Sequence, residues 1–240
     1  MSNKIKIFTL STNNYNQFNQ SFLTSFNNMF MPNVEKEFFI FTDYVDNPIF
    51  KEFNVKPYFI EHQNWPMITL KRYQYMDDII SDTLEEDDLC IFADIDLEVQ
   101  KTIDTFSVNK YFGVSHPGNF KVNNLNSLED NPNSTAYVDK QYIPYNYQYI
   151  QGCLWGGIYE HFIDLVGTLN GNTQKDLSNN IITKWHDESH LNKFYIDNIS
   201  DFNIFSSSYA YPENWNLPIE KIIIHKDKNM EQYPRFEGIQ

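Results

Sequence analysis

The sequence predicts an α/β fold in which a mainly parallel, Rossmann-like mixed sheet is flanked by helices. Strand-like and helix-like segments follow one another in the order strand, helix, strand, strand, helix, strand. The last of these strands, Leu89–Ala93, is an uninterrupted apolar run with acidic residues on both sides. Such runs are typical of a strand that is buried on both faces of a sheet, which supports the α/β class.

Before residue 89, the sequence predicts three strands and two helices. Residues 5–10 alternate between apolar and polar side chains and then turn polar, which predicts a strand that ends in a loop. One stripe of an amphipathic helix follows, formed by Phe18, Phe22, Phe26 and Phe30. Short strands are predicted at residues 38–41 and 56–60. Pro66 is placed like the first residue of a helix, which residues 68–80 continue.

The C-terminal half is predicted to add two strands and two helices. The strands are expected at residues 111–115 and 221–225, and the helices at residues 159–169 and 186–195. Residues 123–147 are polar, aperiodic and interrupted by proline. This stretch is too long for a plain connection, so we expect a functional loop or an inserted subdomain there.

Composition limits the class of protein. A chain of 240 residues is long enough for one substantial domain and short for two, so residues 1–240 are predicted to form a single domain. The net charge of −14 argues against a nucleic-acid partner and against an anionic membrane surface. Cys90 and Cys153 lie among apolar neighbours and are expected to be buried free thiols. Because neither a signal peptide nor a membrane span is visible, we expect a soluble, cytoplasmic protein.

The triplet Asp94-Ile95-Asp96 follows the buried strand directly. Both carboxylates are therefore expected at the carboxyl end of that strand, where ligands bind in α/β sheets. Residues i and i+2 of an extended chain point to the same face, so the pair can converge on one cation. Carboxylate oxygens suit Mg²⁺ or Mn²⁺, which often share a site with substrate phosphates. Such a triplet occurs about once by chance in this chain, so its position carries the interpretation.

Residues 185–193 hold an aromatic ring, two imidazoles, two carboxylates and a cation in one short segment. An acidic first turn of a helix explains the carboxylates but not Trp185 and the two histidines. His116-Pro117-Gly118 is a turn that presents a histidine, and the glycines of residues 151–157 allow a ligand to approach the backbone or form a structural bend. The basic residues from His225 onward form a charged tail or a clamp for a diphosphate.

In this order the segments resemble glycosyltransferase family 6, the family of the blood-group A and B transferases and the α-1,3-galactosyltransferase. Residues 185–193 match its Trp-His-Asp-Glu-Ser-His-Leu-Asn-Lys signature throughout. Residues 94–96 match its Asp-x-Asp, residues 116–118 its His-Pro-Gly, and residues 134–137 its Ser-x-Ala-Tyr. Residues 212–215 look like its Pro-Glu-Tyr-x-Trp segment. The resemblance suggests a short member of bacterial or phage type without the membrane anchor of vertebrate members.

The resemblance implies a GT-A fold and an α-1,3 transfer of galactose from a UDP-sugar to a β-galactoside-type acceptor, with retention at the anomeric carbon. Asp94 and Asp96 would hold Mn²⁺, or Mg²⁺, against the diphosphate. Glu188 would be the catalytic carboxylate, acting as a nucleophile or as a stabiliser of the oxocarbenium ion. Retention requires either two inversions or a front-face path.

Other roles are implied by position in the family's motifs. Uridine would contact Leu10, Ser11, Thr12 and Tyr15. The donor sugar would contact Arg72, Asp187 and the triplet Gln151, Gly152 and Cys153. Lys228 and Arg235 would close over the diphosphate, with Lys226 as the alternative if the alignment shifts by two. The acceptor would contact His116, Trp185 and His186.

Three departures from the family pattern affect the expected metal dependence, donor sugar and acceptor. Bacterial relatives often carry Asn-x-Asn and work without metal, whereas this chain keeps both aspartates, so metal dependence is expected. Cys153 is larger than the family's usual Gly or Ala, which favours galactose, then glucose, over GalNAc. Asn119 and Phe120 replace an aromatic pair, so the acceptor is not inherited. A metal-dependent UDP-sugar hydrolase and a catalytically silent carbohydrate-binding protein remain as alternatives.

Overall fold

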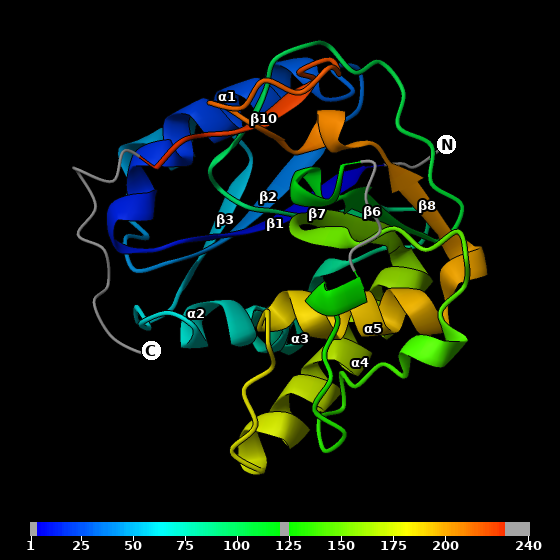
Figure 1. Ribbon diagram of the computed structural model, residues 1–240. Coiled ribbons are helices and arrows are strands. Elements are labelled where there is room, and N and C mark those ends of the chain that lie inside the picture. Colours follow the sequence, from blue (N-terminus) through cyan, green and yellow to red (C-terminus); the bar gives the residue numbers. More distant parts are fainter. Residues whose placement is uncertain (1–3, 121–124, 229–240) are drawn as a thin grey trace.

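A computed structural model describes residues 4–120 and 125–228, in which a seven-stranded sheet separates two layers of helix. Helix α1 (Asn19–Met29) covers one face of the sheet, and three helices cover the other (Figure 1). These are α3 (Arg72–Thr83), α4 (Tyr159–Ser178) and α5 (Asp187–Asp197). The arrangement confirms the predicted α/β class with helices on both faces.

The sheet has the strand order β3-β2-β1-β4-β7-β6-β8. Its strands in chain order are β1 (Ile5–Ser11), β2 (Lys36–Thr42), β3 (Val55–Phe59), β4 (Leu89–Ala93), β6 (Tyr111–Ser115), β7 (Ile150–Ile158) and β8 (Phe202–Phe205). The pairs β3–β2, β2–β1, β1–β4 and β6–β8 are parallel, whereas β7 is antiparallel to both of its neighbours. The sheet is therefore mixed and mainly parallel, as predicted.

A second sheet is small and lies beside α1. It has the order β5-β10-β9 and consists of β5 (Leu97–Val99), β10 (Ile223–His225) and β9 (Tyr211–Pro212). Strand β10 is antiparallel to β5 and parallel to β9. Because β5 begins just after Asp96, this sheet brings the end of the described chain back to the carboxyl end of β4.

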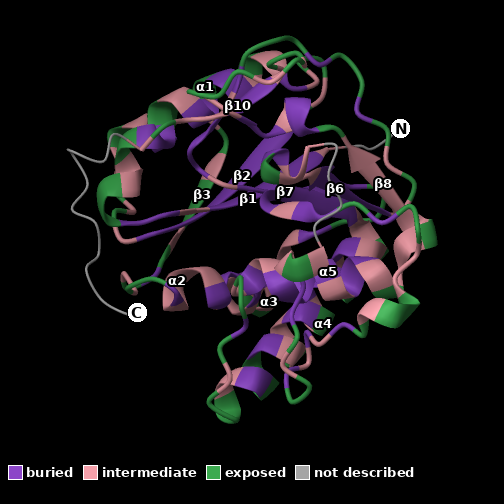
Figure 2. Ribbon diagram, in the orientation of Figure 1, coloured by how far each residue is buried: buried purple, intermediate pink, exposed green. Residues whose placement is uncertain are grey.

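Two hydrophobic cores fill the space between the sheet and its helices. The predicted phenylalanine stripe of α1 is confirmed, because Phe22, Phe26 and Phe30 are fully buried against one face. Tyr73 of α3 and Phe162 of α4 pack against the other face. Figure 2 shows the buried central strands between these layers. Among the described residues Cys90 and Cys153 are buried free thiols, as predicted.

The predicted helix over residues 68–80 is present but divided. Pro66 precedes the short helix α2 (Met67–Leu70), and α3 begins after Lys71. Short 3-10 turns connect other elements, at Asn13–Phe18, Pro48–Glu52, Pro117–Asn119, Leu125–Ser127, Lys140–Tyr142, Ile199–Asp201 and Ser207–Tyr209. Within residues 4–120 and 125–228, no helix is both long and apolar enough to cross a membrane.

Residues 125–147 form a loop, one of the two predicted alternatives, whereas the glycine-rich segment forms a strand. From residue 125 to residue 147 the chain forms an extended loop with two 3-10 turns, and the part described contains no strand or α-helix that would make a subdomain. The glycine-rich residues 151–157 lie within β7 instead of a loop. A Cβ atom at Gly156 would lie 2.1 Å from the carbonyl oxygen of Cys90, and one at Gly157 would lie 2.5 Å from that of Lys110. These two glycines therefore permit close packing of strands.

Candidate active site

The carboxyl edge of the parallel strands gathers most of the residues singled out in the sequence. Strand β1 ends at Ser11 and β4 ends at Ala93, directly before Asp94. Antiparallel β7 begins at the same edge, and its Cys153 carbonyl accepts a hydrogen bond from the Asp94 amide at 2.8 Å. The first turn of α5, which carries Asp187 and Glu188, packs against Gly152 of β7. Distant parts of the chain thus meet beyond one sheet edge.

Asp94 and Asp96 lie together with His225, a residue of β10. Each of the three offers one ligand atom, and these atoms lie within 4.8 Å of one another. Both oxygens of Asp96 are buried, and each faces one basic side chain. Oxygen Oδ1 lies 3.1 Å from Nε2 of His225, and Oδ2 lies 2.9 Å from Nζ of Lys228. Two carboxylates and an imidazole gathered in this way fit a divalent cation.

The charges around this cluster shift its pKa values in opposite directions. Loss of water contact, together with the Asp96 charge, raises the pKa of Asp94 to about 6 even though Arg72 opposes the shift. Burial would also raise the pKa of Asp96, but the charges of His225 and Lys228 lower it well below the ordinary value. Although burial alone lowers the pKa of His225, the charge of Asp96 raises it overall. A bound cation would therefore favour the ionised form of Asp94.

Arg72 connects the aspartate cluster to α5. Its guanidinium is buried and lies 3.5 Å from a carboxylate oxygen of Asp94 and 3.1 Å from one of Asp187. It also donates a 3.0 Å hydrogen bond to the carbonyl oxygen of Gly152 and stacks on the ring of Phe92 at 4.5 Å. Because each contact comes from a different element, Arg72 fixes the spacing of the carboxylates across the site.

Glu188 lies in the first turn of α5, half-buried against β7. Its Oε2 accepts a 2.7 Å hydrogen bond from the Gly152 amide, and the Tyr149 hydroxyl lies nearby. Burial raises the pKa of Glu188 to about 7, against the lowering effect of the Gly152 amide. A Cβ atom at residue 152 would lie 3.1 Å from Oδ2 of Asp187 and 3.5 Å from the Glu188 side chain. The glycine therefore lets β7 approach both carboxylates.

The turn before α5 has a strained backbone. His186 has φ 52°, in the left-handed region that non-glycine residues rarely adopt. The turn is held by a 2.7 Å hydrogen bond from Thr183 Oγ1 to the His186 carbonyl and a 2.9 Å bond from the Trp185 amide to Ser189 Oγ. This conformation starts α5 directly at Asp187, so that both of its acidic residues lie in the first turn.

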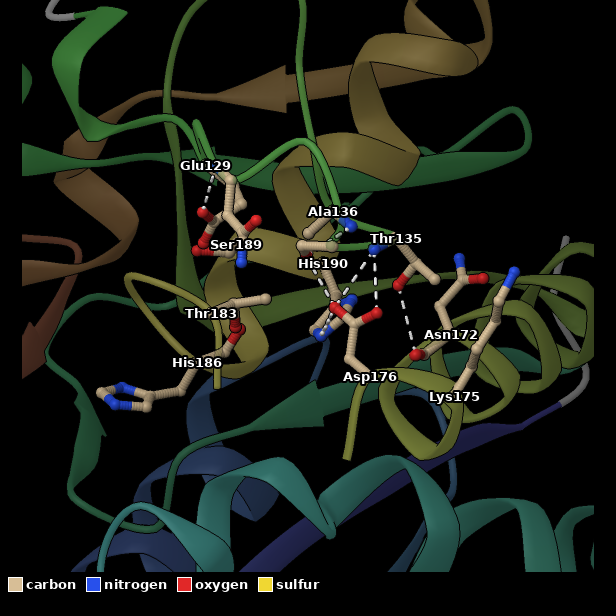
Figure 3. A network of polar contacts seen from close by, with 12 residues as sticks. Glu129, Thr135, Ala136, Asn172, Lys175, Asp176, Thr183, His186, Ser189 and His190 are labelled. Carbon is tan, nitrogen blue, oxygen red and sulfur yellow. Dashed lines mark hydrogen bonds and ion pairs between the residues drawn. The ribbon is translucent and has the colours of Figure 1, made fainter. Parts of the chain in front are cut away.

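A buried polar network supports this turn from behind (Figure 3). Asp176 of α4 accepts hydrogen bonds from Ser134 Oγ at 2.6 Å and from the Thr135 amide at 2.8 Å. His190 lies 3.9 Å from the same carboxylate, and its pKa is lowered by burial. The ring of His186 points out of this network (Figure 3). The network thus joins the loop that contains residues 134–137 to α4, through Asp176, and to α5, through His190.

The residues predicted to meet uridine lie at the end of β1. Oγ1 of Thr12 is 3.0 Å from Nδ1 of His62, and Ser11 donates a hydrogen bond to the Asn16 side chain at 3.2 Å. The ammonium group of Lys228 lies over the Tyr15 ring at 4.9 Å while it contacts Asp96. Leu10 precedes them and is partly buried. Lys228 thus links Tyr15, the last of these four positions, to the aspartate pair.

The two candidate lysines of the tail have different partners. Lys228 reaches Asp96, whereas Lys226 pairs with Glu213 at 2.9 Å and lies 3.7 Å from Glu98. The structure thus brings the side chain of Lys228, and not that of Lys226, to the aspartate pair. Arg235 lies outside the described residues.

The residues predicted to meet an acceptor are spread around the opening of the site. Trp185 is 51% exposed, and the His186 ring meets the exposed Trp65 ring edge-on at 4.3 Å between centroids. Nδ1 of His116 accepts a 2.9 Å hydrogen bond from the Gly118 amide, so the imidazole is oriented by its own turn. Next to His116 is a cavity of ≈ 450 Å³ whose lining carries hydroxyl, amide and aromatic groups, from Ser115, Asn119, Phe120, Tyr145, Asn146, Tyr147, Gln148, Tyr149, Ser206 and Ser207.

The sequence did not point to three residues of this region, which are His62, Trp65 and Tyr149. It also did not indicate the individual role of His225. His225 was visible only as part of a basic tail, and its place beside Asp96 depends on pairing between β5 and β10. Gln151 and Cys153, which were predicted, lie on either side of Gly152. The side chain of Gln151 approaches Nδ1 of His225 at 3.5 Å, and Cys153 is 2% exposed.

Comparison with known proteins gives a consistent assignment. Residues 3–232 match the family model described as "Glycosyltransferase family 6". The "O-antigen biosynthesis glycosyltransferase WbnI" of Escherichia coli is 32% identical over 232 residues, which cover 95% of this chain and 97% of that protein. The "Globoside alpha-1,3-N-acetylgalactosaminyltransferase 1" of Gallus gallus is 22% identical over 95% of this chain and 68% of its own length. The "Histo-blood group ABO system transferase 2" of Rattus norvegicus is 24% identical over 56% of this chain and 40% of its own.

Proposed function

The chain belongs to glycosyltransferase family 6, and from that membership we propose that it is a retaining α-1,3-glycosyltransferase that moves galactose from UDP-galactose to a β-galactoside-type acceptor. Its mixed sheet flanked by helices agrees with the GT-A fold of this family. The observation that carries the proposal is the position of Glu188. This carboxylate accepts a hydrogen bond from the Gly152 amide, next to Asp187 and its partner Arg72, and it follows the exposed Trp185 in the same segment.

We place the UDP part of the donor along the end of β1. Uridine would lie against Leu10, Ser11, Thr12 and the ring of Tyr15, where His62 contacts Thr12. Lys228 already lies between Tyr15 and Asp96, so a diphosphate bound there would meet its ammonium group. Arg235 is the further cation proposed for the diphosphate. A lysine or arginine stabilises the negative charge that develops on departing UDP.

Asp94 and Asp96 are the residues proposed to hold Mn²⁺, with Mg²⁺ as the alternative. The buried oxygens of Asp96 and the partly exposed carboxylate of Asp94 fit this role. A bound dication would neutralise charge on the diphosphate leaving group. Arg72, which contacts Asp94 and Asp187, keeps the cation site and the sugar-binding carboxylate at a constant separation. Asp187 would then accept hydrogen bonds from donor-sugar hydroxyls.

Glu188 is proposed to stabilise the positive charge that develops on the transferred sugar. The Gly152 amide holds one carboxylate oxygen, and the other would face the reacting carbon. Two routes would give retention. In one, Glu188 forms and releases a covalent glycosyl-enzyme; in the other, the acceptor attacks from the side of the departing UDP while Glu188 stabilises an oxocarbenium ion. Mass spectrometry of the protein after rapid quenching would detect the covalent adduct of the first route.

Donor preference is proposed to follow the triplet at the start of β7. Cys153 is larger than Gly or Ala and almost fully buried, so it would act as a wall behind Gln151 and Gly152. We expect UDP-galactose to be the best donor, followed by UDP-glucose and then by UDP-GalNAc. The acceptor is proposed to contact His116, Trp185 and His186. The uncharged polar lining of the neighbouring cavity suits a neutral sugar, such as a unit of a bacterial surface glycan of the kind named for the Escherichia coli relative.

A donor and acceptor panel tests this function. The protein would be incubated with each of the three UDP-sugars, with Mn²⁺ or EDTA, and with or without β-galactosides, and release of UDP would be measured. The proposal expects Mn²⁺-dependent release that rises when an acceptor is present, with a product whose α-1,3 linkage is visible by NMR. Equal release with and without acceptor, accompanied by free galactose, would identify a hydrolase. Binding of sugar without any release of UDP would identify a silent binding protein.

A further inference from the structure

The contact between Asp96 and His225 is not explained by Asp94 and Asp96 acting alone. Nε2 of His225 lies 3.1 Å from Oδ1 of Asp96, and the His225 side chain is only 19% exposed. Both atoms are buried and face each other as an ion pair, with no other hydrogen-bond partner among the residues that the structure describes. When the imidazole is neutral and its proton is on Nδ1, two buried lone pairs meet there, and a shared cation would satisfy both of them.

The separation of these atoms fits a shared cation. Neighbouring ligands at right angles around an octahedral ion, with bonds of about 2.1 Å, lie about 3 Å apart. The 3.1 Å distance between Nε2 and Oδ1 agrees with that value. Asp94 offers a third atom, within 4.8 Å of the other two. The second oxygen of Asp96 faces Lys228 instead, which leaves Oδ1 for the cation.

The fold fixes His225 in this place through the small sheet. Strand β10 pairs with β5 so that His225 lies opposite Leu97, the residue after Asp96. The Lys226 amide also donates a 2.9 Å hydrogen bond to the Asp96 carbonyl oxygen. The imidazole is therefore held beside the Asp-x-Asp turn by backbone contacts on both of its sides.

Gln151 is placed to set the tautomer of this histidine. Its Nε2 lies 3.5 Å from Nδ1 of His225, while its Oε1 is buried and has no hydrogen-bond partner within residues 4–120 and 125–228. The two ends of an amide group have nearly the same shape. Half a turn of the amide would place Oε1 against Nδ1, where it could accept the Nδ1 proton. Nε2 would then carry the lone pair that a metal ion needs.

We propose that His225 is the third protein ligand of the divalent cation, that Gln151 orients it, and that this nitrogen ligand makes the site prefer Mn²⁺ and other transition-metal ions to Mg²⁺. Imidazole suits transition metals, whereas Mg²⁺ takes oxygen ligands. The inference rests on the proposed function, because it concerns the cation that would bind the diphosphate. It adds a ligand from the other end of the chain and a preference among ions.

Electron spin-echo spectroscopy of bound Mn²⁺ tests the ligand directly, because it detects a coordinated nitrogen. The full-length protein would be loaded with Mn²⁺ and UDP, with histidine at natural abundance or labelled with ¹⁵N. We expect a ¹⁴N coupling that changes to ¹⁵N with the label and disappears in His225→Ala. Affinity for Mn²⁺ should fall about 10- to 100-fold in that variant, while affinity for Mg²⁺ changes less. His161→Ala is the matched control, since His161 lies on α4 against Tyr111 and should change neither reading.

A second variant keeps the test informative if His225→Ala disturbs β10. Gln151→Ala retains the imidazole but removes its partner, and should weaken Mn²⁺ binding about tenfold. Bound Mn²⁺ without a nitrogen coupling, absence of Mn²⁺ binding, or unchanged affinity in His225→Ala would each overturn the inference. Sugar transfer without the coupling would refute only this ligand, whereas the coupling without UDP release from any donor would refute only the proposed function.

Discussion

The two pairs of carboxylates at the sheet edge are built in different ways. Asp187 and Glu188, at the start of α5, have protein partners: Arg72 at 3.1 Å for the first and the Gly152 amide at 2.7 Å for the second. Asp96, just after β4, has buried oxygens whose contacts among the described residues are to His225 and Lys228. One pair is oriented by an arginine and a backbone amide, and we propose that the other receives a cation.

This difference shows how one sheet edge can serve two tasks. A group that stabilises charge on a reacting atom gains from fixed partners, because no reorganisation is needed during the reaction. A group that binds a cation must keep its oxygens available. Arg72 touches one carboxylate of each pair, Asp94 and Asp187, and so keeps the two regions at a constant distance while their chemistry differs.

Asp96→Ala removes the cation-binding side of the comparison and should have the largest effect. Loss of charge stabilisation on the leaving group should lower kcat/KM on the order of 10⁴-fold, and EDTA should do the same to the unaltered protein. Steady-state release of UDP measures both. Asp104→Ala, which changes an exposed aspartate, should leave the rate unchanged. Full activity of the unaltered protein in EDTA would contradict the cation role.

Arg72→Met tests the bridge between the two regions. It leaves Asp187 without its buried partner, which should lower the free energy of unfolding by about 3 kcal/mol. Urea denaturation followed by circular dichroism measures this change. Lys193→Ala removes only the exposed pair with Asp197 and should cost about 0.5 kcal/mol or less. Equal costs in the two variants would show that Arg72 is not a structural bridge.

The enclosed state of Glu188 predicts a pH dependence. Its pKa is raised to about 7, and the carboxylate is the active form, so kcat/KM should rise with pH to a plateau above about 7 and fall about tenfold per unit at lower pH. The hydrogen bond from Tyr149 lowers this pKa, so Tyr149→Phe should move the rising limb to higher pH. A limb that stayed near pH 4.5, or that moved the other way in the variant, would show that Glu188 does not control the profile.

Ser134→Ala should have the smallest effect, because it touches only the network behind α5. Asp176 would lose its 2.6 Å hydrogen bond, at a cost of about 1 to 2 kcal/mol in the free energy of unfolding. Thermal denaturation measures this cost. Ser178→Ala, at an exposed position near the end of the same helix, should change stability by less than about 0.5 kcal/mol. A greater loss in the control than in Ser134→Ala would exclude a supporting role for the network.

Some elements of the fold were predictable from the sequence, and others were not. Strand β4 and the stripe of α1 were predictable, because an unbroken apolar run and a four-residue spacing are local patterns. Strand β7 was not predicted, because its glycines usually indicate loops, whereas Gly156 and Gly157 serve close contact between strands. The place of His225 depends on the register of β10 against β5, and local pattern does not determine the pairing of segments so far apart in sequence.

The proposed catalytic carboxylate was identified in a different way. Glu188 was indicated by a match to the family signature and not by any local physical pattern. Its burial and its bond to Gly152 require β7 and α5 to meet, so its raised pKa was not predictable from the sequence. The helix over residues 68–80 was predicted in position, but the break at Lys71, which lets α3 begin at Arg72, was not.

The most direct test of the central claim is the Glu188→Gln variant, assayed for both transfer and UDP binding. The account predicts that kcat with UDP-galactose falls about 10³-fold while the dissociation constant of UDP, measured by calorimetry with Mn²⁺, stays the same. Glu160→Gln, in the exposed first turn of α4, is the control and should change neither value. Unchanged turnover in Glu188→Gln would contradict the account, because the carboxylate beside Gly152 would then have no part in the chemistry.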